Sequence, residues 1–238
     1  MATSTARPGI DLAEWYPLLV AAGIPTPATL IVRTELDLTP LLDGEEPEGF
    51  SDFLAELAAA AETIGYPLFL RTGYGSGKHE WRDTCFVPAP ADLGQHVFAL
   101  LEWSNLVDLF GLPTGTWVVR ELLPTEAAFT AFGGMPITRE RRYFVEDGQI
   151  LGFTPYWPPE AIVAPSVPDW RERLDAINQM SDGEIAELSA LAIRVSAAVP
   201  GAWSVDFLWV PDRGWLAIDM AHAEASFCWA EHPNAPHF

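Results

Sequence analysis

Two aspartates, Asp206 and Asp219, lie on either side of a turn near the end of the sequence. The residues that flank this turn at 211–214 are rich in aromatic and β-branched types, so we expect an antiparallel hairpin. If Val210 pairs with Trp215, Asp206 lies opposite Asp219, with the two Cβ atoms about 5 Å apart. Two like charges at that separation require a counter-ion, and Mg²⁺ suits carboxylates combined with phosphate oxygens. The pattern predicts a metal site, unless the register shifts by one residue or one aspartate faces solvent or caps a turn.

A second candidate site is a glycine-rich turn at residues 73–78, which follows an apolar segment ending in Arg71 and itself ends in Lys78. In such a turn backbone N–H groups can approach a phosphate while the cations neutralise it. The turn is not a P-loop, which needs glycine at position 72 and Ser or Thr at position 79, and it lacks the third glycine of the dinucleotide fingerprint. The alternative is an ordinary flexible hairpin with a solvated lysine.

A third group of charged residues lies in two segments with strand character. Arg139, Arg141 and Arg142 cluster around Glu140, and strand alternation places Glu140 and Arg142 on one face with Arg141 on the other. Arg142 could hold a phosphate or carboxylate bidentately, with Glu140 beside it as a metal or ribose ligand. The alternative is a surface set of cross-strand ion pairs. Residues 118–122 also place charges inside an apolar strand, which requires an edge position or a ligand.

The elements that position these residues alternate between helix and strand. Helical spacing predicts helices over 11–22, 50–64, 93–110 and 182–198, the last with Asp182 as its N-cap. Strands are expected over 28–33, 67–71, 81–87, 116–123, 139–146, 149–153, 203–210 and 215–219. Asp147-Gly148 is a strong hairpin signal, and residues 38–49 and 158–168 have the composition of loops. This order with several hairpins favours an α+β fold over a doubly wound parallel sheet.

Composition excludes several classes of protein. The chain has 238 residues, with 13 Lys and Arg against 33 Asp and Glu, for a formal net charge of −20. This balance argues against binding to nucleic acid or to an anionic membrane, while 49% hydrophobic residues argue against a disordered acidic tail. The two cysteines form no metal or disulfide pattern. No signal peptide or membrane span is recognisable, so we expect a cytoplasmic protein of one large or two small domains.

Taken in order, these segments resemble the ATP-grasp superfamily. The similar segments are Gly23-Ile24-Pro25-Thr26-Pro27-Ala28-Thr29, residues 67–71 with the glycine-rich turn, Val118-Val119-Arg120-Glu121, residues 140–148, and the Asp206 and Asp219 pair. The nearest subgroups are small phage- and actinobacteria-associated proteins and the eukaryotic chaperone of this fold that assembles a translation initiation factor. The resemblance spans residues 23–222. It implies a reduced N-terminal region at 1–66 and an ATP-grasp domain at 67–238, whose subdomains, 67–123 and 124–238, grip a nucleotide with antiparallel sheets.

The resemblance also implies roles for individual residues, with ATP and Mg²⁺ as cofactors. Asp206 and Asp219 would hold Mg²⁺, and Arg142 and Lys78 would be catalytic, with Arg142 stabilising the transferred phosphoryl group. The residues assigned to the nucleotide are Arg71, Gly73, Gly75, Ser76, Gly77, Lys78, Val119, Arg120, Glu121, Leu122 and Glu140.

The implied activity is ADP-forming ligation of a small-molecule or peptide carboxylate to an amine or thiol through an acylphosphate. The alternative is a non-catalytic ATP-binding chaperone or assembly factor, and a nucleic-acid-modifying ligase is disfavoured by the acidic charge. One departure bears on this choice: family members commonly have D-x-N at the last metal position, where this chain has Asp219-Met220-Ala221. Three alternatives remain: His222 or Glu224 substitutes, the site binds one ion, or catalysis is reduced.

Overall fold

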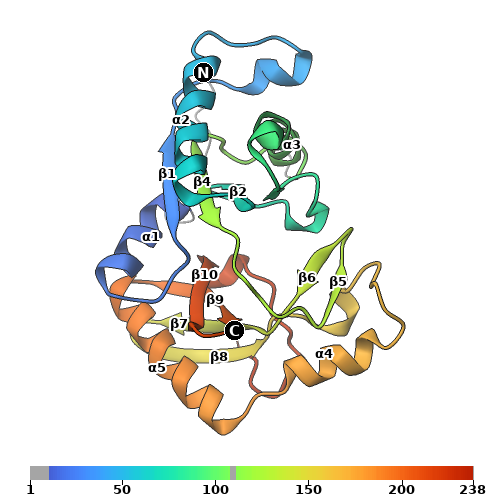
Figure 1. Cartoon of the computed structure of the whole chain (residues 1–238). Helices are drawn as coiled ribbons and strands as arrows, with labels where there is room; N and C mark the ends of the chain where they lie inside the picture. Colours follow the sequence, from blue (N-terminus) through green and yellow to red (C-terminus); the bar gives the residue numbers. More distant parts are fainter. Residues whose placement is uncertain (1–10, 108–110, 238) are drawn as a thin grey trace. The chain divides into compact units, whose positions relative to one another are not determined.

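The computed structural model describes residues 11–107 and 111–237 and is shown in Figure 1. The chain forms two compact units. Unit 1 consists of Met1–Ala13 and Ala28–Leu122, and unit 2 consists of Glu14–Pro27 and Leu123–Phe238. Both units combine helices with antiparallel strands, which confirms the α+β prediction.

Unit 1 is built on a four-stranded antiparallel sheet with the strand order β1-β4-β2-β3. Its elements are β1 (Thr29–Arg33), η1 (Thr39–Asp43), α2 (Phe50–Ile64), β2 (Leu68–Thr72), η2 (Lys78–Glu80), β3 (Phe86–Val87), η3 (Pro90–Asp92), α3 (Leu93–Leu106) and β4 (Thr116–Glu121). The predicted helix at 50–64 is confirmed. The helix predicted over 93–110 ends at Leu106, and its positions 108–110 lie outside the described residues.

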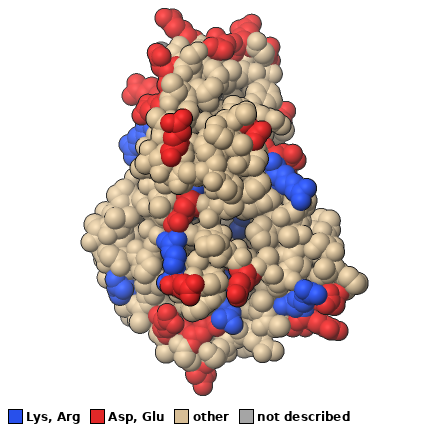
Figure 2. Space-filling model, viewed as in Figure 1, with Lys and Arg blue, Asp and Glu red and all other residues tan. Residues whose placement is uncertain are grey.

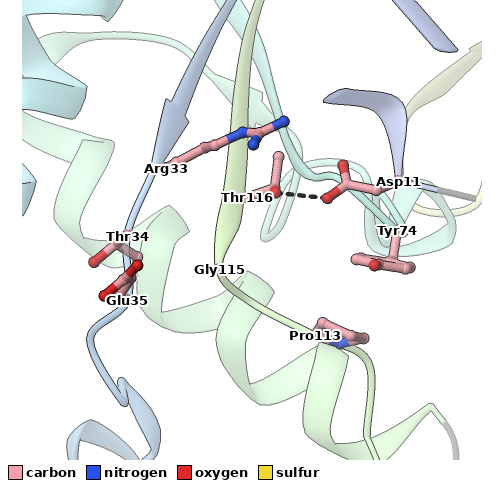
Figure 3. A pocket seen from close by; sticks show the side chains of 8 residues that line it. All are labelled: Asp11, Arg33, Thr34, Glu35, Tyr74, Pro113, Gly115 and Thr116. Carbon is pink, nitrogen blue, oxygen red and sulfur yellow. Dashed lines mark hydrogen bonds between the residues drawn. The ribbon is translucent and has the colours of Figure 1, made fainter. Parts of the chain in front are cut away.

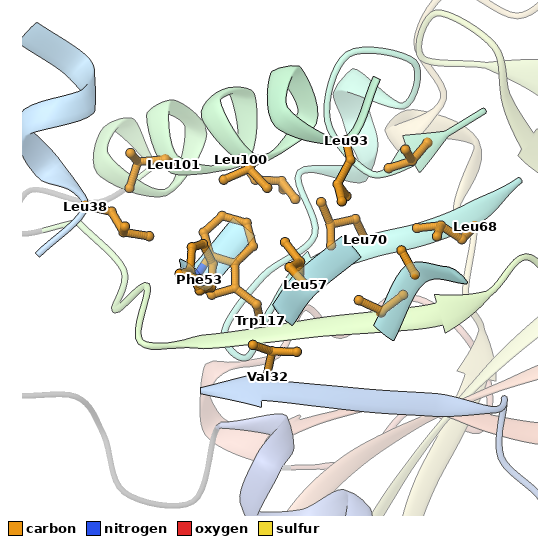
Figure 4. Close-up of a cluster of buried hydrophobic side chains, with 14 residues drawn as sticks. Val32, Leu38, Phe53, Leu57, Leu68, Leu70, Leu93, Leu100, Leu101 and Trp117 are labelled. Carbon is orange, nitrogen blue, oxygen red and sulfur yellow. The ribbon is translucent and has the colours of Figure 1, made fainter. Parts of the chain in front are cut away.

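The two faces of this sheet differ in chemistry. Leu70 on β2 and Trp117 and Val119 on β4 are fully buried among apolar side chains of α2 and α3, as Figure 4 shows. Because side chains alternate along a strand, Arg71 and Arg120 project to the opposite face. The hydrophobic core therefore fixes which face of the sheet carries the arginines.

Unit 2 contains a second four-stranded antiparallel sheet with the order β10-β9-β7-β8 and a two-stranded sheet, β5-β6. Its elements are most of α1 (Leu12–Ala21), then β5 (Phe129–Ala131), β6 (Met135–Ile137), β7 (Glu140–Glu146), β8 (Gln149–Pro155), η4 (Pro159–Ala161), α4 (Trp170–Asn178), α5 (Asp182–Ala198), β9 (Ala202–Val210), β10 (Gly214–His222) and η5 (Ala223–Ala225). Asp147 and Gly148, with φ values of 46° and 81°, form the predicted turn between β7 and β8.

A buried arginine holds the helices of unit 2 against one face of its large sheet. The Nε of Arg141 on β7 donates to Glu184 Oε1 of α5 at 2.6 Å. Its Nη2 donates to the carbonyl oxygens of Ile177 and Gln179 at 2.9 and 3.0 Å, where α4 ends. Arg141 therefore faces the helices, and the next residue, Arg142, projects from the opposite, open face. This arrangement confirms the predicted alternation along β7.

The return strand predicted over 81–87 is wrong except for its last two residues. The chain instead forms the short helix η2 and a turn before β3 begins at Phe86. Thr84 explains the difference, because its hydroxyl donates to the carbonyl oxygens of Gly77 and Glu80 at 2.8 and 3.0 Å. These bonds hold the segment in a helical turn, which keeps it out of the sheet.

Two further differences concern short elements and a helix cap. The strands β5 and β6 and the helix α4 were not predicted, since each is too short or too polar to show a clear period. The N-cap of α5 is Ser181 rather than Asp182, because the Ser181 Oγ accepts from the Glu184 N–H at 3.2 Å. Asp182 is the first residue of the helix.

This cap gives a direct test of the α5 boundary. We expect Ser181→Ala to lower the free energy of unfolding by about 1 kcal/mol, because a backbone N–H of the first turn loses its acceptor. Ser181→Thr keeps the acceptor oxygen and should change stability by less than about 0.5 kcal/mol. Urea titrations of the two variants and the wild type measure both values. A larger loss for Asp182→Ala than for Ser181→Ala would contradict the assignment.

Candidate functional site

The open face of the unit 2 sheet carries a buried ion pair at its centre. Arg142 on β7 lies opposite Asp206 on β9. The guanidinium binds the carboxylate with two parallel hydrogen bonds, Nε to Oδ1 at 2.7 Å and Nη2 to Oδ2 at 2.8 Å. Its Nη1 donates to the Phe227 carbonyl oxygen at 3.0 Å, and the guanidinium carbon lies 4.7 Å from the centre of the Tyr156 ring. Arg142 is therefore held in one orientation by groups on all sides.

The charge of Arg142 is fixed by this environment. Burial alone would lower the pKa of the guanidinium, but the Asp206 carboxylate, through its charge and its hydrogen bonds, raises the pKa above its ordinary value, with smaller contributions from Tyr156 and Asp219. The pair thus places a permanent positive charge at the middle of the open face.

Asp219 lies beside this pair, opposite Asp206 as predicted. The predicted pairing within the hairpin was nevertheless off by one residue, because Val210 pairs with Gly214 rather than with Trp215. An irregularity between Ala217 and Asp219 restores the expected alignment. In a regular ladder Ile218 would oppose Asp206, so the bulge brings a carboxylate to this position in place of an apolar side chain.

Glu140 lies two residues before Arg142 on the same face of β7. Its carboxylate is buried, and its Oε1 accepts from the Thr138 hydroxyl and from the Trp157 indole N–H, both at 3.1 Å. These two donors set the orientation of the carboxyl group. The open face therefore places Glu140, Arg142, Asp206 and Asp219 on three adjacent strands.

The oxygen atoms on this face fit Mg²⁺ only as part of a larger ligand set. Among the described residues, no group of three or more His, Cys, Asp or Glu side chains is arranged to hold a metal. Asp206 and Asp219 supply two carboxylates, and Mg²⁺ commonly binds one or two carboxylates together with phosphate oxygens and water. The residues fit a metal that arrives with a phosphate ligand, and the counter-ion between the aspartates of the described structure is Arg142.

The glycine-rich turn of unit 1 is tightly packed, in contrast to the open loop expected of a phosphate cradle. The Gly73 N–H donates to the Thr116 carbonyl oxygen at 2.8 Å, and the Gly75 N–H donates to Thr72 Oγ1 at 3.1 Å. A Cβ at position 73 would overlap the Asp11 carboxylate, and one at position 75 would lie 2.5 Å from the Trp103 ring. Close packing therefore explains both glycines, and both N–H groups are already used within the protein.

The remaining predicted nucleotide residues of unit 1 lie on two faces of its sheet. Arg71 and Arg120 are buried on the face opposite the helices, with Arg120 Nε donating to Thr29 Oγ1 at 3.1 Å. Glu121 Oε1 accepts from the Ala28 N–H at 2.7 Å. The Val119 side chain lies in the core, so only its backbone remains for ligand contact. Ser76, Gly77 and Lys78 follow in the glycine-rich turn and at the start of η2, and Leu122 directly follows β4.

Sequence reasoning missed the aromatic and hydroxyl groups that hold the charged residues in place. Tyr156 contacts Arg142, while Thr138 and Trp157 orient Glu140. Their positions just outside the strand ends give a weak signal: Tyr156 and Trp157 directly follow β8, and Thr138 follows β6. Contacts of this kind depend on which strands become neighbours, so spacing alone does not predict them.

The charge distribution and the helices add two observations. Figure 2 shows basic side chains as separate spots on the viewed face, with acidic side chains spread among them. No helix in the described part of the chain is long and apolar enough to cross a membrane.

Comparison with known families and structures identifies related folds. Residues 54–235 match the model of an ATP-grasp domain family, family 3 of its clade. No curated protein sequence matches the chain. C-terminally truncated Cdc123 from Schizosaccharomyces pombe has a TM-score of 0.55 at 14% identity, with 90% of this chain and 83% of that chain covered.

Two further structures belong to larger proteins. D-alanine–D-alanine ligase from Bacillus anthracis, complexed with ATP, has a TM-score of 0.51 at 14% identity, with 92% of this chain and 57% of that chain covered. A biotin carboxylase ATP-type complex from Campylobacter jejuni has a TM-score of 0.53 at 15% identity, with 89% and 40% covered. This chain thus spans about half the length of these two proteins. Identities this low establish similarity of fold alone.

The ion pair on the open face can be tested by a double-mutant cycle. We expect Asp206→Ala to destabilise the protein by about 3–5 kcal/mol, because the guanidinium of Arg142 loses its carboxylate while it stays buried. Arg142→Ala should also destabilise the protein, and the double variant should cost clearly less than the sum of the two. Urea titrations measure each free energy of unfolding.

The exposed pair Arg173 and Asp169 provides a matched control. It has the same residue types and a Nε–Oδ2 distance of 2.9 Å, but its side chains are 48% and 45% exposed. Its coupling energy should be below about 0.5 kcal/mol. Equal coupling in the two cycles would show that burial does not strengthen the Arg142 pair.

Proposed function

The chain belongs to this ATP-grasp domain family, and from this premise we propose that it binds ATP with Mg²⁺ and ligates a carboxylate to an amine or thiol. The observation that carries the proposal is the open face of unit 2, where Glu140, Arg142, Asp206 and Asp219 lie on adjacent strands. Two carboxylates beside a fixed guanidinium suit a metal-bound polyphosphate better than either group alone would.

In unit 2, Asp206 and Asp219 hold Mg²⁺, and Arg142 contacts the transferred phosphoryl group. Bound Mg²⁺ neutralises charge on the phosphate oxygens. Arg142 can turn donors toward a phosphoryl oxygen because a guanidinium has five N–H groups. Glu140 is the ribose or metal ligand, and its orientation by Thr138 and Trp157 is already set.

In unit 1, Arg71 and Lys78 bind the phosphates, and Arg120, Glu121 and the backbone of residues 119–122 bind adenosine. The glycine-rich turn contributes through Ser76, Gly77 and Lys78, because the N–H groups of Gly73 and Gly75 are engaged within the protein. Gly73 and Gly75 then act by allowing close packing of the turn, which places Lys78.

The reaction follows from the groups present. A substrate carboxylate oxygen attacks the γ-phosphorus of ATP, the bond to the β–γ bridging oxygen breaks, and ADP leaves. An amine or thiol then attacks the carbonyl carbon of the acylphosphate, the carbon–oxygen bond breaks, and phosphate leaves. The proposed role of the protein is to position the reactants and to stabilise the charge on the transferred group, which is how proteins generally promote phosphoryl transfer. The substrates we propose are small molecules or peptides.

The second candidate is a non-catalytic ATP-binding chaperone or assembly factor. Asp219-Met220-Ala221 favours it, since alanine supplies no side-chain oxygen at the position where the family commonly has asparagine. Nucleic acid remains a disfavoured partner, because the chain has a formal charge of −20 and its basic residues lie in separate spots on the viewed face. The free cysteines Cys85 and Cys228 suit a reducing compartment, and we place the protein in the cytoplasm.

Isothermal titration with ATP tests the nucleotide and metal sites. We expect wild-type protein to bind ATP with Mg²⁺ and to bind it at least about tenfold more weakly without Mg²⁺. Asp219→Asn should remove this Mg²⁺ dependence while the fold stays intact, because the variant loses a charged ligand of the metal. Asp212→Asn in the exposed turn of the same hairpin is the matched control and should bind as the wild type does. Unchanged Mg²⁺-dependent affinity in Asp219→Asn would show that the metal site is elsewhere.

Release of ADP separates the two candidate functions. For a ligase we expect ADP to form only when a carboxylate and an amine or thiol are both added, since the acylphosphate needs an acceptor. Arg142→Lys should lower this rate by at least about a hundredfold, because a single ammonium cannot replace the bidentate guanidinium. Tight ATP binding with no ADP release from any pair in a broad screen would favour the assembly factor.

A further inference from the structure

Unit 1 contains a cavity of about 470 Å³ that the proposed ligase site does not use. It is lined by Asp11, Arg33, Thr34, Glu35, Tyr74, Pro113, Gly115 and Thr116, as Figure 3 shows. All of these residues belong to unit 1. The volume lies in the range of small-molecule sites, and most of the lining side chains are polar.

The wall of this cavity is built around the Asp11 carboxylate. Asp11 is 9% exposed; its Oδ1 accepts from the Ala13 N–H at 2.9 Å and its Oδ2 accepts from the Thr116 hydroxyl at 2.7 Å. Gly73 allows this placement, because any Cβ there would overlap the carboxylate. Asp11 is therefore a negative charge held in a fixed position, and neither of these two hydrogen-bond donors carries a charge.

Arg33 brings the opposite charge to the same cavity. It ends β1 directly opposite Thr116, and Figure 3 shows its side chain reaching across Thr116 toward the side where Asp11 and Tyr74 lie. Within residues 11–107 and 111–237, the Arg33 guanidinium makes no hydrogen bond or ion pair with Asp11, Glu35 or any other side chain. The cavity thus has a positive and a negative group that face one space without neutralising each other.

The signs of these charges restrict the ligand. An anion would meet the carboxylates of Asp11 and Glu35, and a cation would meet the guanidinium of Arg33. A small molecule that has both charges satisfies both walls, with its carboxylate on Arg33 as a bidentate pair and its ammonium on Asp11 and Glu35. We propose that this cavity binds a free α-amino acid as its zwitterion. The proposal does not depend on the ligase activity, although a ligase would have in this ligand a source of carboxylate and amine.

Titration calorimetry of the whole protein without ATP tests this site. The probes are the standard L-amino acids, and then, for any that binds, its amide and its N-acetyl derivative, which keep only the ammonium or only the carboxylate. We expect at least one amino acid to bind, and both derivatives to bind at least about tenfold more weakly, because each leaves one charged wall unmatched. The amide and the N-acetyl form also represent the two ends of a peptide, so equal binding of either one would overturn the zwitterion proposal.

Variants locate the binding. Arg33→Gln should weaken amino-acid binding by at least about tenfold, and Glu35→Gln should weaken it by a smaller factor. Arg82→Gln removes another exposed arginine of unit 1 and is the matched control, with unchanged binding expected. Equal affinity in Arg33→Gln and the wild type would overturn the proposal.

Two outcomes separate this site from the proposed function. Failure of every amino acid to bind at up to about 10 mM, in protein that binds ATP, would overturn the cavity proposal and leave the nucleotide site standing. Amino-acid binding in protein that does not bind ATP would support the cavity and overturn the proposed function.

Discussion

The open face of unit 2 depends on one ion pair. Asp206 and Asp219 oppose each other on β9 and β10, and two carboxylates so placed would repel each other in a medium of low polarity. Arg142 removes this conflict, because it binds Asp206 through both oxygens from the next strand. The pair also sets the limits of chemistry on this face: a second cation can join only if it brings its own anionic ligands. That condition is met by a metal bound to a polyphosphate and is not met by a bare metal ion.

Backbone irregularities adapt the fold to these charges. The bulge before Asp219 replaces an apolar side chain with a carboxylate at the centre of the sheet, at the cost of a regular ladder. In unit 1, Gly73 leaves room for the Asp11 carboxylate, which in turn ties the start of α1 to β4 through Thr116. In both units, therefore, a local departure from regular geometry positions an acidic group that a regular element would have excluded.

Much of the fold follows from period and turn chemistry, while the details of the sites do not. The apolar spacing of residues 50–64 and the Asp147-Gly148 turn define their elements because local sequence decides both. The opposition of Asp206 and Asp219 was predicted from a turn pairing that is off by one, and the bulge at Ile218 compensates, which no spacing rule reveals. Glycine type cannot distinguish a phosphate cradle from close packing, because both require the missing Cβ. Ser181 and Asp182 are equally good caps in isolation, and only the backbone conformation selects between them.

Neither unit is a continuous stretch of chain, and this affects the order of events during synthesis. Residues 14–27 belong to unit 2, yet their partners come from far along the chain: Arg194 donates to the Gly23 carbonyl oxygen at 2.9 Å, and the Ala217 N–H donates to the Pro25 carbonyl oxygen at 2.8 Å. On the ribosome, the strands and helices of unit 1 can pair as soon as residue 122 has emerged, while α1 waits for β10. The first helix of the chain is thus among the last elements to gain its native contacts, and the apolar residues of α1 stay exposed to chaperones throughout translation.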